Sequence, residues 1–210
     1  MSFCKPYIIG IAGGSCSGKT TASKKIYETI EHALGESNGN ICLISQDSYY
    51  FSGDHDTNYD IPSALDFDLM YENLQKLILN ETVEIPIYDF SKHMRTEDVQ
   101  ILNSAKIIII EGILILTQEK IRNLCDLKIF VEADNTICYT RRLKRDVKER
   151  GRTFEEVEKR YLDHVVPCFN NYIYPSRYYA NIILVNNTHE TFVGLSILLD
   201  HIEKKINNFK

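Results

Sequence analysis

The chain has 210 residues, a length that suits one domain with a well-buried core, and we expect residues 1–210 to form that domain. Its 29 aspartate and glutamate residues outnumber its 24 lysine and arginine residues, and the net charge of −5 argues against a broad nucleic-acid-binding face. No apolar run is long enough to span a bilayer or to form a signal-peptide core, so we expect a soluble protein of the cytoplasm.

The first predicted element is a buried strand over residues 7–12, and a glycine-rich sequence follows it directly. Residues 13–20 read GGSCSGKT, which fits the pattern G-x-x-x-x-G-K-[ST], and residues 21–34 have the pattern of a helix. Glycines let the backbone curl around phosphate oxygens, and the helix N-terminus adds partial positive charge. The flanking elements favour a nucleoside triphosphate site over a solvated turn. The expected contacts are Gly13, Gly14, Ser15, Ser17, Gly18, Lys19, Thr20 and Thr21.

Three side chains of this phosphate loop have separate expected roles. Lys19 supplies a mobile positive charge, and the Thr20 hydroxyl suits Mg²⁺. Cys16 precedes the predicted helix, an environment that makes thiols reactive, so we predict that its alkylation blocks nucleotide binding. The six cysteines are scattered without a C-x-x-C pair, which favours free thiols over disulfides or a zinc site.

Strand patterns and helical patterns alternate along the chain. Continuous β-branched runs predict strands covered on both faces, and hence a doubly wound, mostly parallel α/β sheet. The expected strands are 7–12, 41–45, 107–110, 127–131 and 182–185, and the expected helices are 21–34, 69–79, 135–149, 153–170 and 189–207. Gly35 follows the first helix, Asp66 suits a cap of the second, and Gly151 suits the end of the third. The alternation weakens over about residues 48–104, where we expect a small insertion that binds an acceptor.

Two carboxylates follow predicted strands. Asp47 comes just after residues 41–45, and Glu111 ends the run at 107–110. Ligands of open α/β sheets lie at the carboxyl ends of the strands. We therefore expect Glu111 to join Thr20 at the magnesium site and Asp47 to accept a proton from an attacking hydroxyl group. The alternative is that each carboxylate caps a strand end or pairs with Lys19.

Seven basic residues crowd residues 141–152. Arg141, Lys144 and Lys148 are expected to form a solvated helix face with salt bridges. The other arginines suit a lid over about residues 141–165, with Gly151 as its hinge. Such a lid neutralises charge on a transferring phosphoryl group and excludes water. The expected lid arginines are Arg142, Arg145, Arg150 and Arg152.

Aromatic and acidic residues gather in the insertion. Tyrosine rings and His93 are suited to stack on or hydrogen-bond a flat base, and carboxylates are suited to sugar hydroxyls. Taken singly, each of these residues is more often a packing or surface residue than a ligand. The residues concerned are Tyr49, Tyr50, Tyr59, Asp60, Tyr88, Asp89, Phe90 and His93.

In this order, the motifs closely resemble those of the uridine kinase (uridine–cytidine kinase) family. They are GGSxSGKTT at 13–21, SQDSYY at 45–50, NYDxP at 58–62, PxYDF at 86–90, HxR at 93–95, EGIL at 111–114, RRxxRD at 141–146, ERGR at 149–152 and PSxxYA at 175–180. The resemblance implies a P-loop NTPase-type fold and transfer of the γ-phosphoryl group of ATP, or of GTP, to the 5′-hydroxyl of uridine or cytidine with Mg²⁺. It also implies a homotetramer.

The resemblance further implies a role for each matched residue. Asp47 matches the general base, and Lys19, Arg145 and Arg150 match phosphate-binding residues. Thr20 and Glu111 match the magnesium environment. The implied ribose contacts are Asp60 and Arg142, and the implied base contacts are Tyr88, His93 and Arg152.

Four positions depart from the family pattern, and two other functions stay open. Ile61, Ser63, Arg160 and Asn181 replace His, Asp, Gln and Asp, respectively, which leaves the substrate breadth open. One alternative is a related kinase, resembling phosphoribulokinase or pantothenate kinase, with another small acceptor. The other is a nucleotide-binding switch, which would need no Asp47. The sequence does not rank uridine against cytidine or ATP against GTP, and it leaves feedback by CTP or UTP open.

Overall fold

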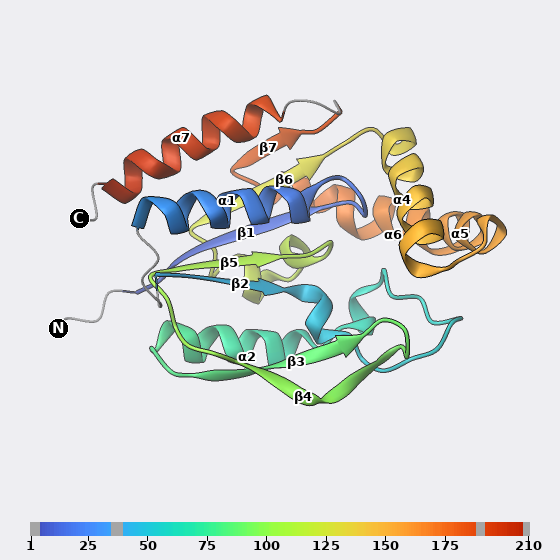
Figure 1. Cartoon of the computed structure of the whole chain (residues 1–210), viewed down its shortest axis with the longest axis horizontal. Helices are drawn as coiled ribbons and strands as arrows, with labels where there is room; N and C mark the ends of the chain where they lie inside the picture. The colour runs from blue at the N-terminus through green and yellow to red at the C-terminus, as the bar shows by residue number, and fades with distance from the viewer. Residues whose placement is uncertain (1–4, 35–39, 188–191, 208–210) are drawn as a thin grey trace.

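The central sheet is parallel throughout. The computed structural model describes residues 5–34, 40–187 and 192–207. Within these residues the sheet has the strand order β2-β5-β1-β6-β7, and every neighbouring pair runs parallel (Figure 1). This confirms the predicted doubly wound α/β fold. The strands are β1 (Tyr7–Gly13), β2 (Ile41–Ser45), β5 (Ile107–Glu111), β6 (Leu127–Glu132) and β7 (Ile182–Val185).

Both faces of the sheet are covered, which explains the continuous apolar runs. Ile108 of β5 belongs to one buried cluster and its neighbour Ile109 to the other, because successive side chains of a strand point to opposite faces. The helices α1 (Lys19–Leu34) and α7 (Val193–Asn207) cover one face, and α2 (Phe67–Ile78) lies on the other side of the sheet (Figure 1). No helix of the described residues is long and apolar enough to cross a membrane.

The helix ends follow the local sequence. Asp66 caps α2, since its carboxylate accepts from the Leu69 N–H at 3.0 Å. The helix α4 (Asn135–Arg150) ends at Gly151, which has a φ of 65°, a conformation that glycine adopts without steric cost. Gly35 lies outside the described residues, as do the first three residues of the predicted helix 189–207. A short helix, α3 (Glu119–Arg122), was not predicted.

A two-stranded hairpin in the insertion was also not predicted. It pairs β3 (Val83–Asp89) with β4 (Met94–Leu102) in antiparallel fashion. Pro86, which cannot donate to a ladder, lies inside β3, and the register shifts just after it. Arg95 ties the hairpin to the segment after β2, because its guanidinium donates to the Tyr49 and Tyr50 carbonyls at 2.9 and 3.0 Å.

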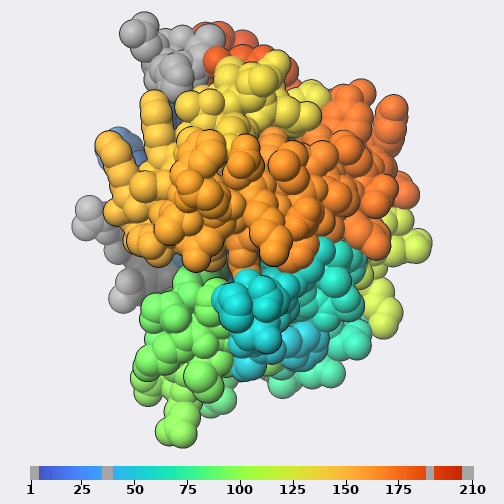
Figure 2. All heavy atoms as spheres, turned by 90° about the vertical axis from the view of Figure 1, so that its right-hand side faces the viewer, coloured from blue at the N-terminus to red at the C-terminus, as the bar shows by residue number. Residues whose placement is uncertain are grey.

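The prediction of one regular helix over residues 153–170 is wrong. It begins as α5 (Phe154–Arg160) and continues through α6 (Val166–Cys168) to a 3₁₀ turn that ends at Tyr179, with wider π-helical turns on either side of α6. Pro167 explains the break, because it has no N–H to donate and its ring crowds the preceding turn. Figure 2 shows this orange segment lying against the cyan and green residues of the insertion.

Candidate active site

The phosphate loop connects β1 to α1 in a tight turn. A Cβ atom on Gly13 would lie 2.3 Å from the Val131 carbonyl oxygen, so this position admits only glycine. Gly18 has a φ of 101°, which favours glycine as well. The loop is held from outside, since the Asn186 amide donates to the Ser17 carbonyl at 2.8 Å. Asn186 follows β7 and was not predicted, because 169 residues separate the partners.

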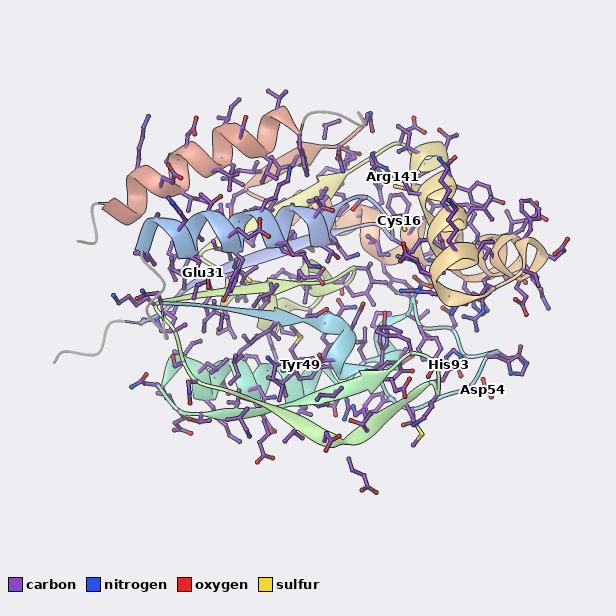
Figure 3. The ribbon with its side chains drawn as sticks, viewed as in Figure 1. Cys16, Glu31, Tyr49, Asp54, His93 and Arg141 are labelled. Carbon is purple, nitrogen blue, oxygen red and sulfur yellow. The ribbon has the colours of Figure 1, made fainter. Side chains whose placement is uncertain are left out.

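A large cavity of about 1100 Å³ opens beside this loop. Lys19, Thr20 and Thr21 line it from the first turn of α1. Arg141 also lines it and donates to the Cys16 carbonyl at 3.5 Å; Figure 3 shows both residues where α4 meets the loop. The prediction that Arg141 belongs to a solvated face was therefore wrong: the end of β1 brings the loop within reach of α4. Lys144 and Lys148 are exposed, as predicted.

Two carboxylates lie next to the loop because of the strand register. Glu111 pairs with Ile11 of β1 on one side and with Ser45 of β2 on the other. The Ser45 hydroxyl donates to Glu111 Oε1 at 3.0 Å and accepts from the Asp47 N–H at 3.3 Å. One hydroxyl thus links the Glu111 carboxylate to the main chain of Asp47, a role that was not predicted. Both Asp47 and Glu111 line the large cavity.

The surroundings of Glu111 fit Mg²⁺. Thr20 Oγ1 lies 3.4 Å from Glu111 Oε2, and burial raises the pKa of this carboxyl while the Lys19 charge opposes the rise. Mg²⁺ prefers oxygen ligands and uses few protein groups besides substrate phosphates. A hydroxyl and a carboxylate beside a phosphate loop fit that preference. Within the described ranges, no three His, Cys, Asp or Glu side chains gather as a metal cage would require.

A small cavity of about 100 Å³ adjoins the large one. Lys19, Asp47, Arg145 and Arg150 line both, which joins the predicted acceptor side to the phosphate side. All the predicted base and ribose contacts line the small cavity: Asp60, Tyr88, His93, Arg142 and Arg152. The structure therefore brings together, from separate elements, the residues that the sequence singled out.

The charges of the small cavity shape its titrating groups. Burial raises the pKa of Asp60, against the effect of the Arg142 guanidinium. Burial also lowers the pKa of His93 below its ordinary value of 6.5, and the charges of Arg160 and Arg152 lower it further. The His93 ring stacks on Tyr59 at 5.7 Å between centroids and lies on the insertion, below the lid helices in Figure 3. The lowered pKa favours the neutral form of the His93 ring at neutral pH.

Four lid arginines surround one buried carboxylate. Asp146 of α4 is 0% exposed, and each of its oxygens lies within 3.5 Å of two guanidinium nitrogen atoms. Arg142 also donates to Ser15 of the phosphate loop at 2.9 Å, and the Arg150 guanidinium lies 5.4 Å from the Phe90 ring centroid of the hairpin. The lid arginines therefore contact the phosphate loop and the insertion at once.

The four departures from the family pattern have different surroundings. Ile61 packs against the core, and Ser63 is exposed. Asn181 accepts from the Lys128 N–H at 2.8 Å and so links β6 to β7. Arg160 alone of the four lines the small cavity, where its Nη2 atom is buried and has no hydrogen-bond partner among the described residues.

Comparisons with known proteins agree with this geometry. The sequence matches the model of a family described as the phosphoribulokinase / uridine kinase family over residues 8–191. A uridine kinase from Anoxybacillus flavithermus is 42% identical, over 95% of this chain and 94% of that protein. A uridine kinase from Lactococcus lactis subsp. lactis is 40% identical, over 97% of this chain and 99% of that protein. A solved D-glycerate 3-kinase from Cryptococcus neoformans var. grubii has a TM-score of 0.64 at 14% identity, over 91% of this chain and 89% of that one, a likeness of fold alone.

Proposed function

The chain belongs to the phosphoribulokinase/uridine kinase family of P-loop kinases, and on that premise we propose that it transfers the γ-phosphoryl group of ATP to the 5′-hydroxyl of uridine or cytidine. The products are ADP and UMP or CMP. The observation that carries the proposal is the junction of the two cavities at Asp47, beside Lys19 and the lid arginines. A hydroxyl group in the small cavity would meet a phosphoryl group from the large cavity at this junction.

The proposed roles follow from position. Asp47 accepts the proton of the 5′-hydroxyl as its oxygen bonds to phosphorus and the bond from phosphorus to the ADP oxygen breaks. Lys19, Arg145 and Arg150 neutralise charge on the phosphoryl oxygens. Mg²⁺, when bound to the triphosphate, would be held by Thr20 and Glu111 and would neutralise charge on the phosphates. The contacts proposed for the nucleoside are Asp60 and Arg142 at the ribose and Tyr88, His93 and Arg152 at the base.

Family membership supports ATP as the phosphoryl donor, and we propose GTP as an alternative donor. We also propose a cytoplasmic location for the protein. The resemblance further implies that it forms a tetramer. Phosphoribulokinase-like or pantothenate kinase-like acceptors are less well supported. The two relatives compared above, about 40% identical over nearly the whole chain, are named uridine kinases. The small cavity combines Tyr88, His93 and Tyr59, whose rings suit a base.

Nucleoside-dependent release of ADP tests the proposal. We expect uridine or cytidine to stimulate turnover strongly, and Asp47→Asn to reduce kcat by at least about 10²-fold while ATP still binds. Asp68→Asn, which removes an exposed carboxylate of α2, is the matched control and should keep wild-type turnover. Stimulation by sugar phosphates in place of nucleosides would refute the proposed acceptor. ADP release that needs no acceptor and survives Asp47→Asn would instead identify a nucleotide-dependent switch.

A further inference from the structure

The carboxylate of Asp146 lies outside both cavities yet contacts four residues that line the small one. Its Oδ1 atom is 2.8 Å from Arg145 Nε and 3.4 Å from Arg150 Nη1. Its Oδ2 atom is 3.3 Å from Arg152 Nη1 and 3.5 Å from Arg142 Nε. The carboxylate has no exposed surface, so it faces these arginines and not a ligand. It is the shared partner of four guanidinium groups that line the small cavity.

The main chain of Asp146 fixes the turn that separates Arg150 from Arg152. Its carbonyl accepts from the Gly151 N–H and from the Arg152 N–H, the latter at 3.1 Å. These two bonds close the left-handed turn that ends α4 and directs the chain into α5. Arg150 and Arg152 flank that turn and return to the carboxylate from both sides. Asp146 therefore holds the turn between these two residues through its carbonyl and their guanidinium groups through its carboxylate.

The four guanidinium groups need a negative charge between them to stay close together. Four guanidinium groups around a cavity of about 100 Å³ repel one another. Burial acts to raise the pKa of Asp146, but the Arg145 hydrogen bond and the surrounding arginine charges outweigh it and hold the pKa below its ordinary value. The carboxylate is thus charged at neutral pH. It offsets one of four positive charges and leaves a net positive charge toward the cavity.

We propose that Asp146 is a positioning residue for phosphoryl transfer, which holds the lid arginines in the arrangement that receives the phosphoryl group and the sugar. The proposal rests on the function proposed above. Asp146 itself touches no reacting atom. Its effect on the rate comes through guanidinium groups whose misplacement by about 1 Å can cost about 10²-fold in rate.

Asp146→Asn tests this role, because asparagine keeps the shape of the side chain and loses its charge. We expect kcat for uridine to fall by about 10²-fold while the KM for ATP changes by less than about threefold, since the backbone of the phosphate loop and Lys19, which do not contact Asp146, hold the triphosphate in the ground state. Asp146→Glu keeps the charge and should recover at least about tenfold of that loss. Glu158→Gln, which removes an exposed carboxylate of α5, is the control and should keep wild-type kcat. Equal kcat for wild type and Asp146→Asn would overturn the proposal.

A double-mutant cycle separates positioning from general stability. If Asp146 acts through its arginines, Asp146→Asn should cost clearly less than about 10²-fold in a background that already carries Arg145→Ala and Arg150→Ala, since only Arg142 and Arg152 remain for the carboxylate to position. The same loss in both backgrounds would overturn the proposal, since it would mean that the carboxylate acts elsewhere.

Limited trypsin digestion gives a readout that needs no acceptor. Trypsin cleaves after arginine, so release of the lid should speed cleavage at Arg145, Arg150 and Arg152 in Asp146→Asn relative to wild type and Glu158→Gln. A wild-type protein that does not turn over uridine would refute the proposed function, and the cleavage rates would then decide the role of Asp146. Cleavage at the same rate in Asp146→Asn and in wild type would refute the positioning role of Asp146.

Discussion

Replacing Ser45 by alanine should disturb both carboxylates of the candidate active site. The hydroxyl donates to the buried Glu111 carboxylate and accepts from the Asp47 N–H. A hydrogen bond to a charged group contributes about 1.5–3 kcal/mol, and the loss of a side-chain cap costs about 0.5–2 kcal/mol. We therefore expect Ser45→Ala to lower the free energy of unfolding by about 2–5 kcal/mol.

The same change should slow the reaction. If about half of that free energy is lost in the transition state, where Asp47 and Glu111 must be placed, kcat falls by about 5–70-fold at 1.36 kcal/mol for each factor of ten. Ser176→Ala is the matched control: Ser176 is also a hydrogen-bonded serine, and its hydroxyl donates to the neutral Ile173 carbonyl at 2.7 Å, away from both cavities. It should cost about 1 kcal/mol in stability and leave kcat unchanged.

Urea denaturation and steady-state kinetics on the two variants measure these effects. The reasoning predicts a difference between the variants in both measurements. A Ser45→Ala protein with wild-type kcat would refute the claim that this hydroxyl places the two carboxylates. A stability loss no larger than that of Ser176→Ala would show that the bond to Glu111 contributes no more than a neutral hydrogen bond.

The other predictions concern single side chains of the two cavities. Because the folded pKa of His93 is lowered below 6.5, the KM for uridine should stay flat above pH 6.5 and rise as the pH falls through the folded pKa. The unfolded chain takes up that proton near pH 6.5 and the folded chain only at lower pH, so the free energy of unfolding should fall as the pH drops from about 6.5 through the folded pKa. A KM for uridine that stays flat at acidic pH would contradict this role of His93. His93→Gln, whose side chain does not titrate, is the control. Arg160→Gln removes a charge that lowers the pKa of His93, so it should move the rise in KM to higher pH, and a shift in the opposite direction would count against the contact. His93→Ala should impair discrimination between nucleosides more than phosphoryl transfer, and equal losses with every nucleoside would contradict a role at the base. Alkylation of Cys16, which lines the large cavity, should abolish ATP binding, and bound ATP should slow the alkylation. Cys16→Ser is the control, and alkylation that ATP does not slow would refute this prediction.

Much of the fold was predictable because it depends on local patterns. The strand bounds of β2 and β7 agree with the apolar, mostly β-branched runs at 41–45 and 182–185, although Ile183 and Val185 of the edge strand β7 are exposed. The β3–β4 hairpin was missed, because Pro86 interrupts β3 and the pattern of β4 is mostly polar and exposed. Family membership was predicted correctly from the order of the motifs, which a single motif would not have allowed.

The parts of the site that sequence reasoning missed are contacts between distant residues. Ser45 and Glu111 are 66 residues apart, and Asn186 and Ser17 are 169 apart, so no spacing pattern reveals either pair. Asp146 belongs to the RRxxRD motif at residues 141–146. Its proposed role, however, depends on arginines from both sides of Gly151 that meet at its carboxylate. Arg141 was misjudged for a related reason, since a helical pattern does not say what lies opposite each face.

The two halves of the site are built in different ways, and this bears on which acceptor the chain uses. The phosphate loop and Glu111 are placed by the register of β1, β2 and β5, so they come with the sheet itself. Asp60, Tyr88 and His93 come from the insertion, which can change without altering that register. A solved D-glycerate 3-kinase therefore shares the fold at 14% identity without constraining the acceptor here. The choice between a nucleoside and another alcohol depends on the insertion, and there the neutral His93 ring and the unpartnered Arg160 nitrogen favour a ligand with hydrogen-bonding edges.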